Sequence, residues 1–157
     1  MTLHILSNSE KRKIETQLNE DYGIKEIPGL IVRIGQERLF LFQGSLNEKQ
    51  IKKLESLVPI ERIGTYFAKI LIDKSEEKIK LSIEGVQLLS KQITKNTFEL
   101  NDSQTEEWML GRDLAIKTNK KGFIIIKNKD DFLGSGKASE EKIGNFIPKS
   151  RRLKERS

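Results

Sequence analysis

The feature that most constrains the fold is the shortness of the apolar runs. The longest runs, such as Leu39 to Phe42 and Phe123 to Ile126, are about as long as one short strand and far shorter than a membrane span. Clusters of Gly, Asn, Asp and Lys separate them and are typical of turns. The pattern therefore predicts a soluble α+β protein assembled from short strands and a few helices.

The first part of the chain carries signals for a helix followed by a hairpin. Ser7 and Glu10 match a capping box, in which each side chain accepts a hydrogen bond from the backbone N–H of the other residue. Pro28-Gly29 suits the middle of a type II turn, and strand-like stretches follow at residues 30–34 and 38–42. We expect a helix that begins after Ser7 and a hairpin after the proline.

A second helix is predicted after Asn47, which can cap its first turn. Ile51, Leu54 and Leu57 or Val58 recur at steps of three and four residues, so we expect them to face inward. A proline directly after this pattern ends the helix.

The rest of the chain is rich in short strand-like stretches. We expect extended segments at residues 61–63, 66–72, 78–81, 96–100, 114–117, 122–127 and 132–138. Ser82 or Ile83 opens a short helix, and Ser103 with Glu106 gives a further capping-box signature before Gly111. Short strands with polar turns indicate a small mixed β-barrel in the second half.

The chain divides at a charged segment without periodicity, Asp73 to Glu77. We expect an N-terminal α/β domain over residues 1–72 and a barrel-like domain over residues 78–148. Residues 149–157 hold too little apolar surface to order themselves, so we expect a mobile basic tail there.

The distribution of charge indicates the kind of partner. The net charge is +6, but residues 117–157 carry twelve basic and five acidic side chains, which leaves the preceding residues close to −1. Such asymmetry favours a polyanion, most often nucleic acid. A solvated lysine-rich surface explains the same charges without a ligand, and this alternative stays open.

Several segments resemble PUA-type RNA-binding domains in their order and spacing. These segments are Gly64–Lys69, Leu81–Gly85, Leu110–Leu114, Gly122–Ile126 and Phe132–Lys137. The ending Lys142–Arg152 resembles the RNA-binding tail of Sun-type rRNA cytosine-5 methyltransferases, and the whole plan is similar to archaeal-type assembly factors that join a pre-PUA domain to a PUA domain. The resemblance covers residues 60–152.

The resemblance implies a pre-PUA-like N-terminal domain followed by a PUA-like mixed β-barrel. It also implies a role in ribosome biogenesis, rRNA processing or RNA modification, with structured rRNA or tRNA as the partner and ribosomal or RNA-modification proteins as further partners. No membrane contact is expected, and the absence of cysteine fits a reducing cytoplasm.

The candidate RNA-binding residues are mostly basic side chains that can neutralise phosphates. They are Tyr66, Arg112, Lys117, Lys120, Lys121, Gly134, Gly136, Lys137, Lys142, Asn145, Lys149, Arg151 and Arg152. For the two glycines, a structural role and a ligand-contacting role stay equally open. Tyr66 and Phe67 point to opposite faces of an expected strand, so one is core, which we take to be Phe67, and Tyr66 could stack on an unpaired base. Trp108 is expected in the core.

The residues needed for common catalytic sites are missing. There is no cysteine, and His4 is the single histidine, which leaves no metal or nucleophile constellation around it. The Gly-Lys pair at residues 136–137 lacks the glycine and the hydroxyl residue of a phosphate loop, since Asp131 and Ala138 hold those positions. We expect no enzyme activity, no metal and no cofactor. The alternative function is an adaptor whose near-neutral first part recruits a separate RNA-modifying enzyme or ribosomal partner.

Overall fold

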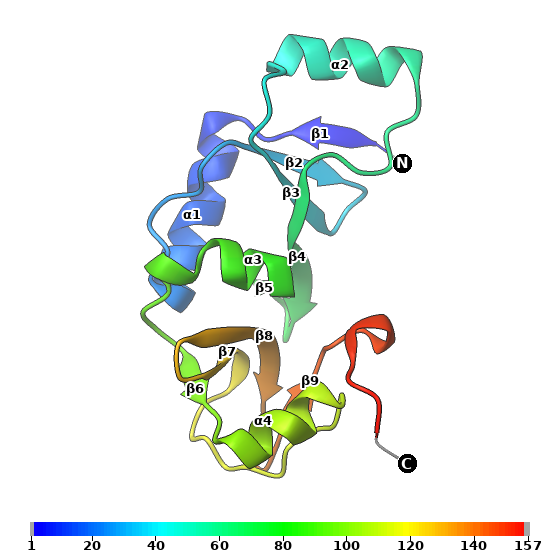
Figure 1. Ribbon diagram of the computed structural model, residues 1–157. Coiled ribbons are helices and arrows are strands. Elements are labelled where there is room, and N and C mark those ends of the chain that lie inside the picture. Colours follow the sequence, from blue (N-terminus) through cyan, green and yellow to red (C-terminus); the bar gives the residue numbers. More distant parts are fainter. Residues whose placement is uncertain (1, 156–157) are drawn as a thin grey trace.

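The computed structural model describes residues 2–155, which form two sheets placed one after the other along an elongated molecule (Figure 1). The first sheet follows chain order and consists of β1 (Leu3–Ile5), β2 (Leu30–Ile34), β3 (Arg38–Phe42), β4 (Thr65–Asp73) and β5 (Glu76–Leu81). The second consists of β6 (Thr97–Glu99), β7 (Gly122–Asn128), β8 (Asp131–Ala138) and β9 (Ile143–Asn145). The named strands pair antiparallel except β6 and β7, which are parallel.

Short helices cover and connect these sheets, which confirms the expected α+β class. They are α1 (Asn8–Tyr22), α2 (Glu48–Leu57), α3 (Ile83–Leu88), α4 (Asp102–Met109) and the 3₁₀ turns η1 (Ser90–Gln92) and η2 (Lys149–Arg151). Within residues 2–155, no helix has the length and apolar character that crossing a bilayer requires.

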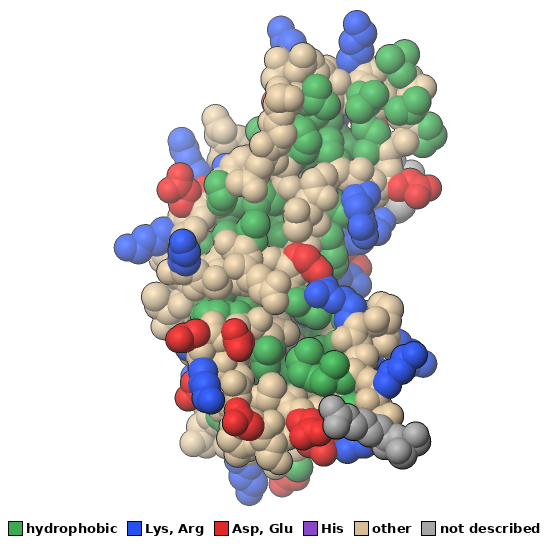
Figure 2. Space-filling model, in the orientation of Figure 1, with side chains coloured by type: hydrophobic (Ala, Val, Ile, Leu, Met, Phe, Trp, Pro, Cys, Tyr) green, Lys and Arg blue, Asp and Glu red, His purple; other side chains and the backbone are tan. Residues whose placement is uncertain are grey.

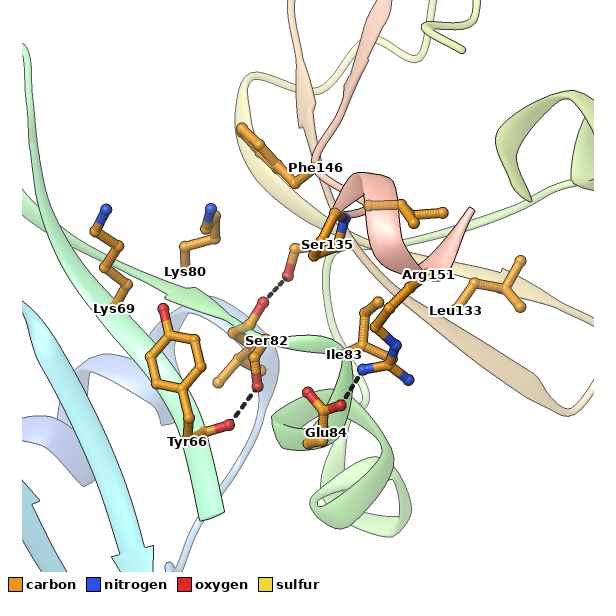
Figure 3. A pocket seen from close by; sticks show the side chains of 13 residues that line it. Tyr66, Lys69, Lys80, Ser82, Ile83, Glu84, Leu133, Ser135, Phe146 and Arg151 are labelled. Carbon is orange, nitrogen blue, oxygen red and sulfur yellow. Dashed lines mark hydrogen bonds and ion pairs between the residues drawn. The ribbon is translucent and has the colours of Figure 1, made fainter. Parts of the chain in front are cut away.

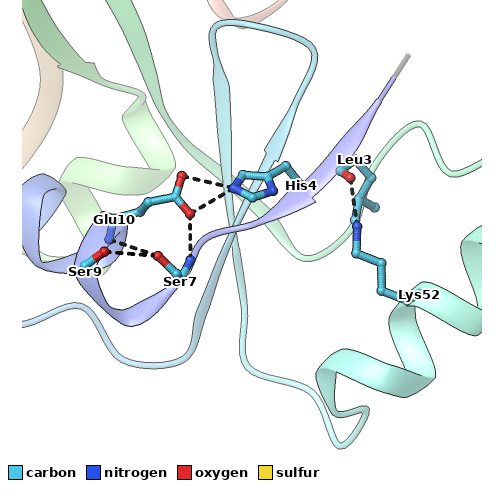
Figure 4. A network of polar contacts seen from close by, with 6 residues as sticks. All are labelled: Leu3, His4, Ser7, Ser9, Glu10 and Lys52. Atoms are coloured by element: carbon cyan, nitrogen blue, oxygen red, sulfur yellow. Dashed lines mark hydrogen bonds and ion pairs between the residues drawn. The ribbon is translucent and has the colours of Figure 1, made fainter.

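The capping box predicted for α1 is present (Figure 4). The Glu10 backbone N–H donates to Ser7 Oγ at 3.2 Å, and the Ser7 N–H donates to Glu10 Oε1 at 2.9 Å. The same carboxylate lies 2.9 Å from His4 Nε2, so His4 is a hydrogen-bonded surface residue. The Ser7 N–H and then His4 lower the pKa of Glu10 from 4.5 to about 2.

The helix predicted after Asn47 forms, but its expected inward face is largely wrong. Asn47 caps α2, and Ile51 is fully buried, whereas Leu54 is 40% exposed and Leu57 72% exposed. The helix is attached at its start through Ile51 and a bond from Lys52 Nζ to the Leu3 carbonyl (Figure 4). No further layer of residues 2–155 covers the remaining apolar side chains, because the periodicity of a helix does not specify what packs against it.

The capping box of α4 starts two residues earlier than expected. Asn101 Oδ1 accepts from the Gln104 N–H at 2.8 Å, and Gln104 Oε1 accepts from the Asn101 N–H at 2.9 Å. Asn101 therefore replaces Ser103 as the cap, since both residue types cap well and the sequence offers both.

The core links the two sheets. Ile125 on β7 packs in the cluster formed by the first sheet and α1, and Ser135 Oγ on β8 donates to the Leu81 carbonyl on β5 at 2.8 Å. Phe67 and Trp108 are fully buried, as expected. The strand expected at residues 114–117 is reduced to a single bridge between Leu114 and Ile143.

The charged segment Asp73 to Glu77 contains the turn of the β4–β5 hairpin, formed by Lys74 and Ser75, which both have positive φ. It therefore joins two strands of one sheet instead of connecting two sheets. The domain boundaries at residues 72 and 78 stay a prediction that fragments of the chain would test.

Residues 149–155, where a mobile basic tail is expected, make hydrogen bonds to the rest of the structure. The Leu153 N–H donates to the Met109 carbonyl at 2.8 Å, and Arg152 Nε donates to the Ile147 carbonyl at 2.9 Å. These hydrogen bonds satisfy backbone groups of a segment that has few apolar residues, and its mobility stays a prediction. Residues 156–157 of the expected tail lie outside the described residues.

Candidate nucleic-acid interface

A cleft of 340 Å³ opens where the first sheet meets the second (Figure 3). One wall comes from β4, β5 and the start of α3, and the other from β8 and the chain that follows β9. The side chains that give it chemical character are two aromatic rings and three cations, namely Tyr66, Phe146, Lys69, Lys80 and Arg151.

A β-bulge brings Tyr66 and Lys69 into the same cleft. Leu39 pairs with Ala68 and Phe40 with Tyr66, so Phe67 is an extra residue in β4 without a partner on β3. A bulge reverses the alternation of side chains, and as a result Phe67 and Ala68 are both buried. Phe67 is the core residue, as expected. Regular alternation of side chains along the strand does not explain its burial, because the bulge buries two consecutive residues.

Strand register places Lys69 directly opposite Lys80 on β5. Two like charges in this position destabilise a sheet, because nothing in the pair offsets their repulsion. Lys69 Nζ is 3.2 Å from Glu37 Oε2, whereas Lys80 makes no ion pair with any of residues 2–155. Burial, and then the charge of Lys69, lower the pKa of Lys80.

Aromatic rings flank this lysine pair. Lys80 Nζ lies 4.1 Å from the centre of the Phe146 ring, a cation–π contact, and Phe146 is 37% exposed. The ring of Tyr66 is half-buried and packs at 5.6 Å from the ring of Phe40. Tyr66 therefore offers one partly covered ring face to the cleft.

Hydrogen bonds hold the walls of the cleft in place (Figure 3). Ser82 Oγ donates to the Tyr66 carbonyl at 2.8 Å and also caps α3. Arg151, one of the candidate RNA-binding residues, forms an ion pair with Glu84 at the opposite end of the cleft from the lysines. The charge of Glu84 is thereby offset inside the chain.

The structure brings the predicted lysines of the 117–121 segment together. Lys117, Lys120 and Lys121 line a separate hollow of 290 Å³ with Ser139 and Glu140. This hollow shares no lining residue with the cleft. The candidate residues therefore fall into at least two groups on the surface.

Other predicted cations contact carboxylates of the same chain. Lys137 Nζ is 3.7 Å from Asp73 Oδ1, and Lys142 Nζ is 3.2 Å from Asp113 Oδ2. Arg112 pairs with Glu107 at 2.6 Å and also with Glu155. These exposed pairs are weak and can exchange for phosphate contacts.

Arg152 and Lys149 make no such contact with a carboxylate of residues 2–155. Arg152 Nε donates to a backbone carbonyl, and the end of its side chain, from Cδ to Cζ, lies against Gly111. Lys149 is exposed on η2 and makes no ion pair within residues 2–155. Its ammonium group is thus open to an external anion.

Gly134, Gly136 and Asn145 have contacts inside the protein that explain them. A Cβ on Gly136 would lie 2.8 Å from Trp108 Cη2, and one on Gly134 would lie 3.1 Å from the side chain of Ile83. Asn145 Nδ2 donates to the carbonyls of Trp108 and Arg112 at 2.8 and 3.0 Å. A part for these residues in RNA binding stays a prediction.

Reasoning from the sequence missed three cleft residues, Lys69, Lys80 and Phe146. The two lysines are eleven positions apart in the sequence, and only the register of the β4–β5 hairpin makes them neighbours. Phe146 lies in the segment that resembles a methyltransferase tail, and its aromatic ring was the one available signal.

Part of this chain is similar to a PUA domain of known proteins. Residues 95–153, which contain the second sheet, match the family model of the PUA domain of the methyltransferase RsmF. This finding confirms the resemblance to PUA domains and to the tails of Sun-type methyltransferases that the sequence indicated.

The particular relatives are named ribosomal RNA small subunit methyltransferase F. The protein from Shewanella oneidensis is 28% identical over 145 residues, which are 91% of this chain and 28% of that relative. The protein from Vibrio campbellii is 27% identical over 150 residues, with 91% of this chain and 29% of the relative covered. The chain thus spans less than a third of the length of these relatives.

Proposed function

We propose that this chain is a non-catalytic RNA-binding protein that acts in the cytoplasm on structured RNA, either rRNA or tRNA. Its role is that of an accessory factor in ribosome biogenesis or RNA modification. The observation that carries this proposal is the match of residues 95–153 to the RsmF PUA domain. The relatives are rRNA methyltransferases by name, which makes rRNA the first ligand to test.

The physical basis is contact with phosphates by exposed lysines. Lys117, Lys120 and Lys121 lie together around one hollow, and Lys149 is open on η2. Each phosphate that these residues neutralise releases counterions, which gives affinity without sequence information. Recognition then depends on the shape of the RNA, as is common for paired RNA.

The test is a titration of the full chain with a structured rRNA fragment across salt concentrations. For about four to six phosphate contacts, the slope of log affinity against log salt should be about −3 to −5. Replacing Lys120 and Lys121 by Ala should make the slope shallower by about one to two units. The matched control is the double change Lys49→Ala and Lys53→Ala on α2, which removes the same charge elsewhere. A flat response, or equal slopes for both variants, would contradict the proposal.

The non-catalytic part of the proposal has its own test. S-adenosylmethionine should neither raise the melting temperature of the protein nor donate methyl groups to unmodified rRNA or tRNA in its presence. A saturable rise in melting temperature would show cofactor binding and overturn this part.

A second candidate function, a protein-interaction adaptor, is favoured by an exposed apolar patch at α2. The patch consists of Leu46, Leu54, Leu57 and Val58, whose side chains are 36% to 72% exposed. Figure 2 shows hydrophobic side chains gathered at this end of the molecule. Exposed patches of this kind mark protein contacts, here with a separate RNA-modifying enzyme or a ribosomal protein. Leu57→Ser should abolish co-purification of such a partner and leave RNA affinity unchanged.

A further inference from the structure

The cleft between the sheets has the components of a site for a single unpaired nucleotide. Phe146 presents a partly exposed ring, and the ring of Tyr66 lines the same cleft. Proteins hold unpaired bases by stacking them on aromatic side chains, and every base has a face suited to this. The two aromatic rings can therefore stack on a base of any identity.

Lys69 and Lys80 can bind an anion such as a phosphate. Lys69 and Lys80 face each other across β4 and β5, and Lys80 has no carboxylate partner in residues 2–155. An anion between the two ammonium groups would relieve their repulsion and stabilise the charged form of Lys80, whose pKa burial lowers. Figure 3 shows both ammonium groups extending to the same side of the cleft.

The size of the cleft selects one nucleotide over a paired helix. Its volume of 340 Å³ lies at the lower end of the range of about 300–1,000 Å³ that is typical of small-molecule sites. A base stacked inside a duplex cannot enter such a space, whereas a base in a bulge or loop can be turned outward. The Arg151–Glu84 pair lines the other end of the cleft.

We propose that the cleft binds one unpaired nucleotide of an RNA chain, with its phosphate between Lys69 and Lys80 and its base against Phe146 and Tyr66. The ammonium group of Lys80 now lies over the Phe146 ring. On binding it moves to the phosphate and leaves that ring face to the base. This inference rests on the proposed RNA-binding function and adds to it the part of the RNA that is recognised.

The test compares two RNA hairpins that differ by one unpaired 2-aminopurine nucleotide in the stem. The full chain should bind the bulged hairpin more tightly than the fully paired one and should change the fluorescence of the unpaired base. Phe146→Ala and Lys80→Gln should each weaken binding of the bulged hairpin by about 5- to 100-fold and bring it close to the paired hairpin. Lys80→Arg should retain most of the preference, because it keeps the charge.

Controls separate the cleft from general charge and from misfolding. Lys78→Gln removes one charge from the same strand, outside the lining of the cleft, and should keep the preference for the bulge. Circular dichroism and melting temperature check that Phe146→Ala folds, and Phe146→Leu keeps apolar volume while it removes the ring.

The outcomes distinguish this inference from the proposed function. Tight binding of both hairpins without preference would overturn the cleft site and leave RNA binding intact. Absence of binding to any RNA would overturn both. Competition by free AMP or UMP as strong as that of the bulged hairpin would mean that the cleft takes a free nucleotide, which would overturn the assignment to an RNA chain.

Discussion

At Gly136 the absence of a side chain allows the second sheet to close over Trp108. A Cβ at this position would lie 2.8 Å from both Trp108 Cη2 and Ile143 Cγ2, and both side chains are fully buried. A contact this short forces the neighbours to shift, because the core is close-packed. The lack of a side chain at Gly136 therefore allows β8 to pack closely against α4 and β9.

Gly136→Ala should lower the free energy of unfolding by about 1–3 kcal/mol through overpacking. Urea denaturation followed by Trp108 fluorescence measures the change. Gly144→Ala is the matched control, since its Cβ would meet nothing closer than 3.7 Å and should change stability by about 0.5 kcal/mol or less. Equal effects of the two substitutions would rule out this account.

Glu10 makes stability depend on pH through the capping box. Its pKa is lowered from 4.5 to about 2, so the carboxylate contributes stability that is fully present above pH 4.5 and is lost as the pH falls toward 2. Glu10→Gln keeps a cap but removes the charge, so wild type and variant should differ at pH 6 and converge near pH 2. Carboxyl NMR titration should place the Glu10 midpoint well below 4.5, and an ordinary midpoint would contradict the prediction.

At the scale of elements, the segment after β9 depends on contacts that lie far away in the chain. Residues 149–155 have almost no apolar content, yet Arg151 on η2 pairs with Glu84, and the Leu153 N–H beyond η2 donates to the Met109 carbonyl. Arg152 also covers Gly111. Through Arg151 the segment also lines the cleft.

Ending the chain at Pro148 should lower the free energy of unfolding by about 1–3 kcal/mol, the sum of a few lost hydrogen bonds. Thermal and urea denaturation of the shortened and full chains measure this difference. An unchanged stability would mean that the segment behaves as the mobile tail that its composition suggests.

At the level of the whole molecule, the two sheets share buried apolar contacts beside the cleft. Ile125 packs with the first sheet, Phe132 packs against the same cluster, and Ser135 bonds to Leu81. Burial of this kind couples the stability of the two halves.

The two sheets should consequently unfold in a single transition. Trp108 fluorescence reports on the second sheet, and far-ultraviolet circular dichroism reports on both, so the two denaturation curves should coincide. Two separate midpoints would show that the sheets are independent units.

Most helix starts, the hairpins and the α+β class could be predicted from the order of the residues. Ser7 and Asn47 begin helices and Gly23 ends α1, because capping and left-handed backbone conformations depend on neighbouring residues alone. Hairpins such as β2–β3 follow from apolar runs and turn residues. The PUA resemblance likewise depended on residues read in order.

Tertiary structure alone decided which of these elements meet. The bulge at Phe67 and the pairing of Lys69 with Lys80 arise from strand register, which is set by packing between distant segments. The exposure of Leu57 on α2 and the docking of residues 149–155 also depend on which surfaces are available to cover them. The cleft could not be predicted from the sequence, because each of its walls is made by contacts between residues far apart in the chain.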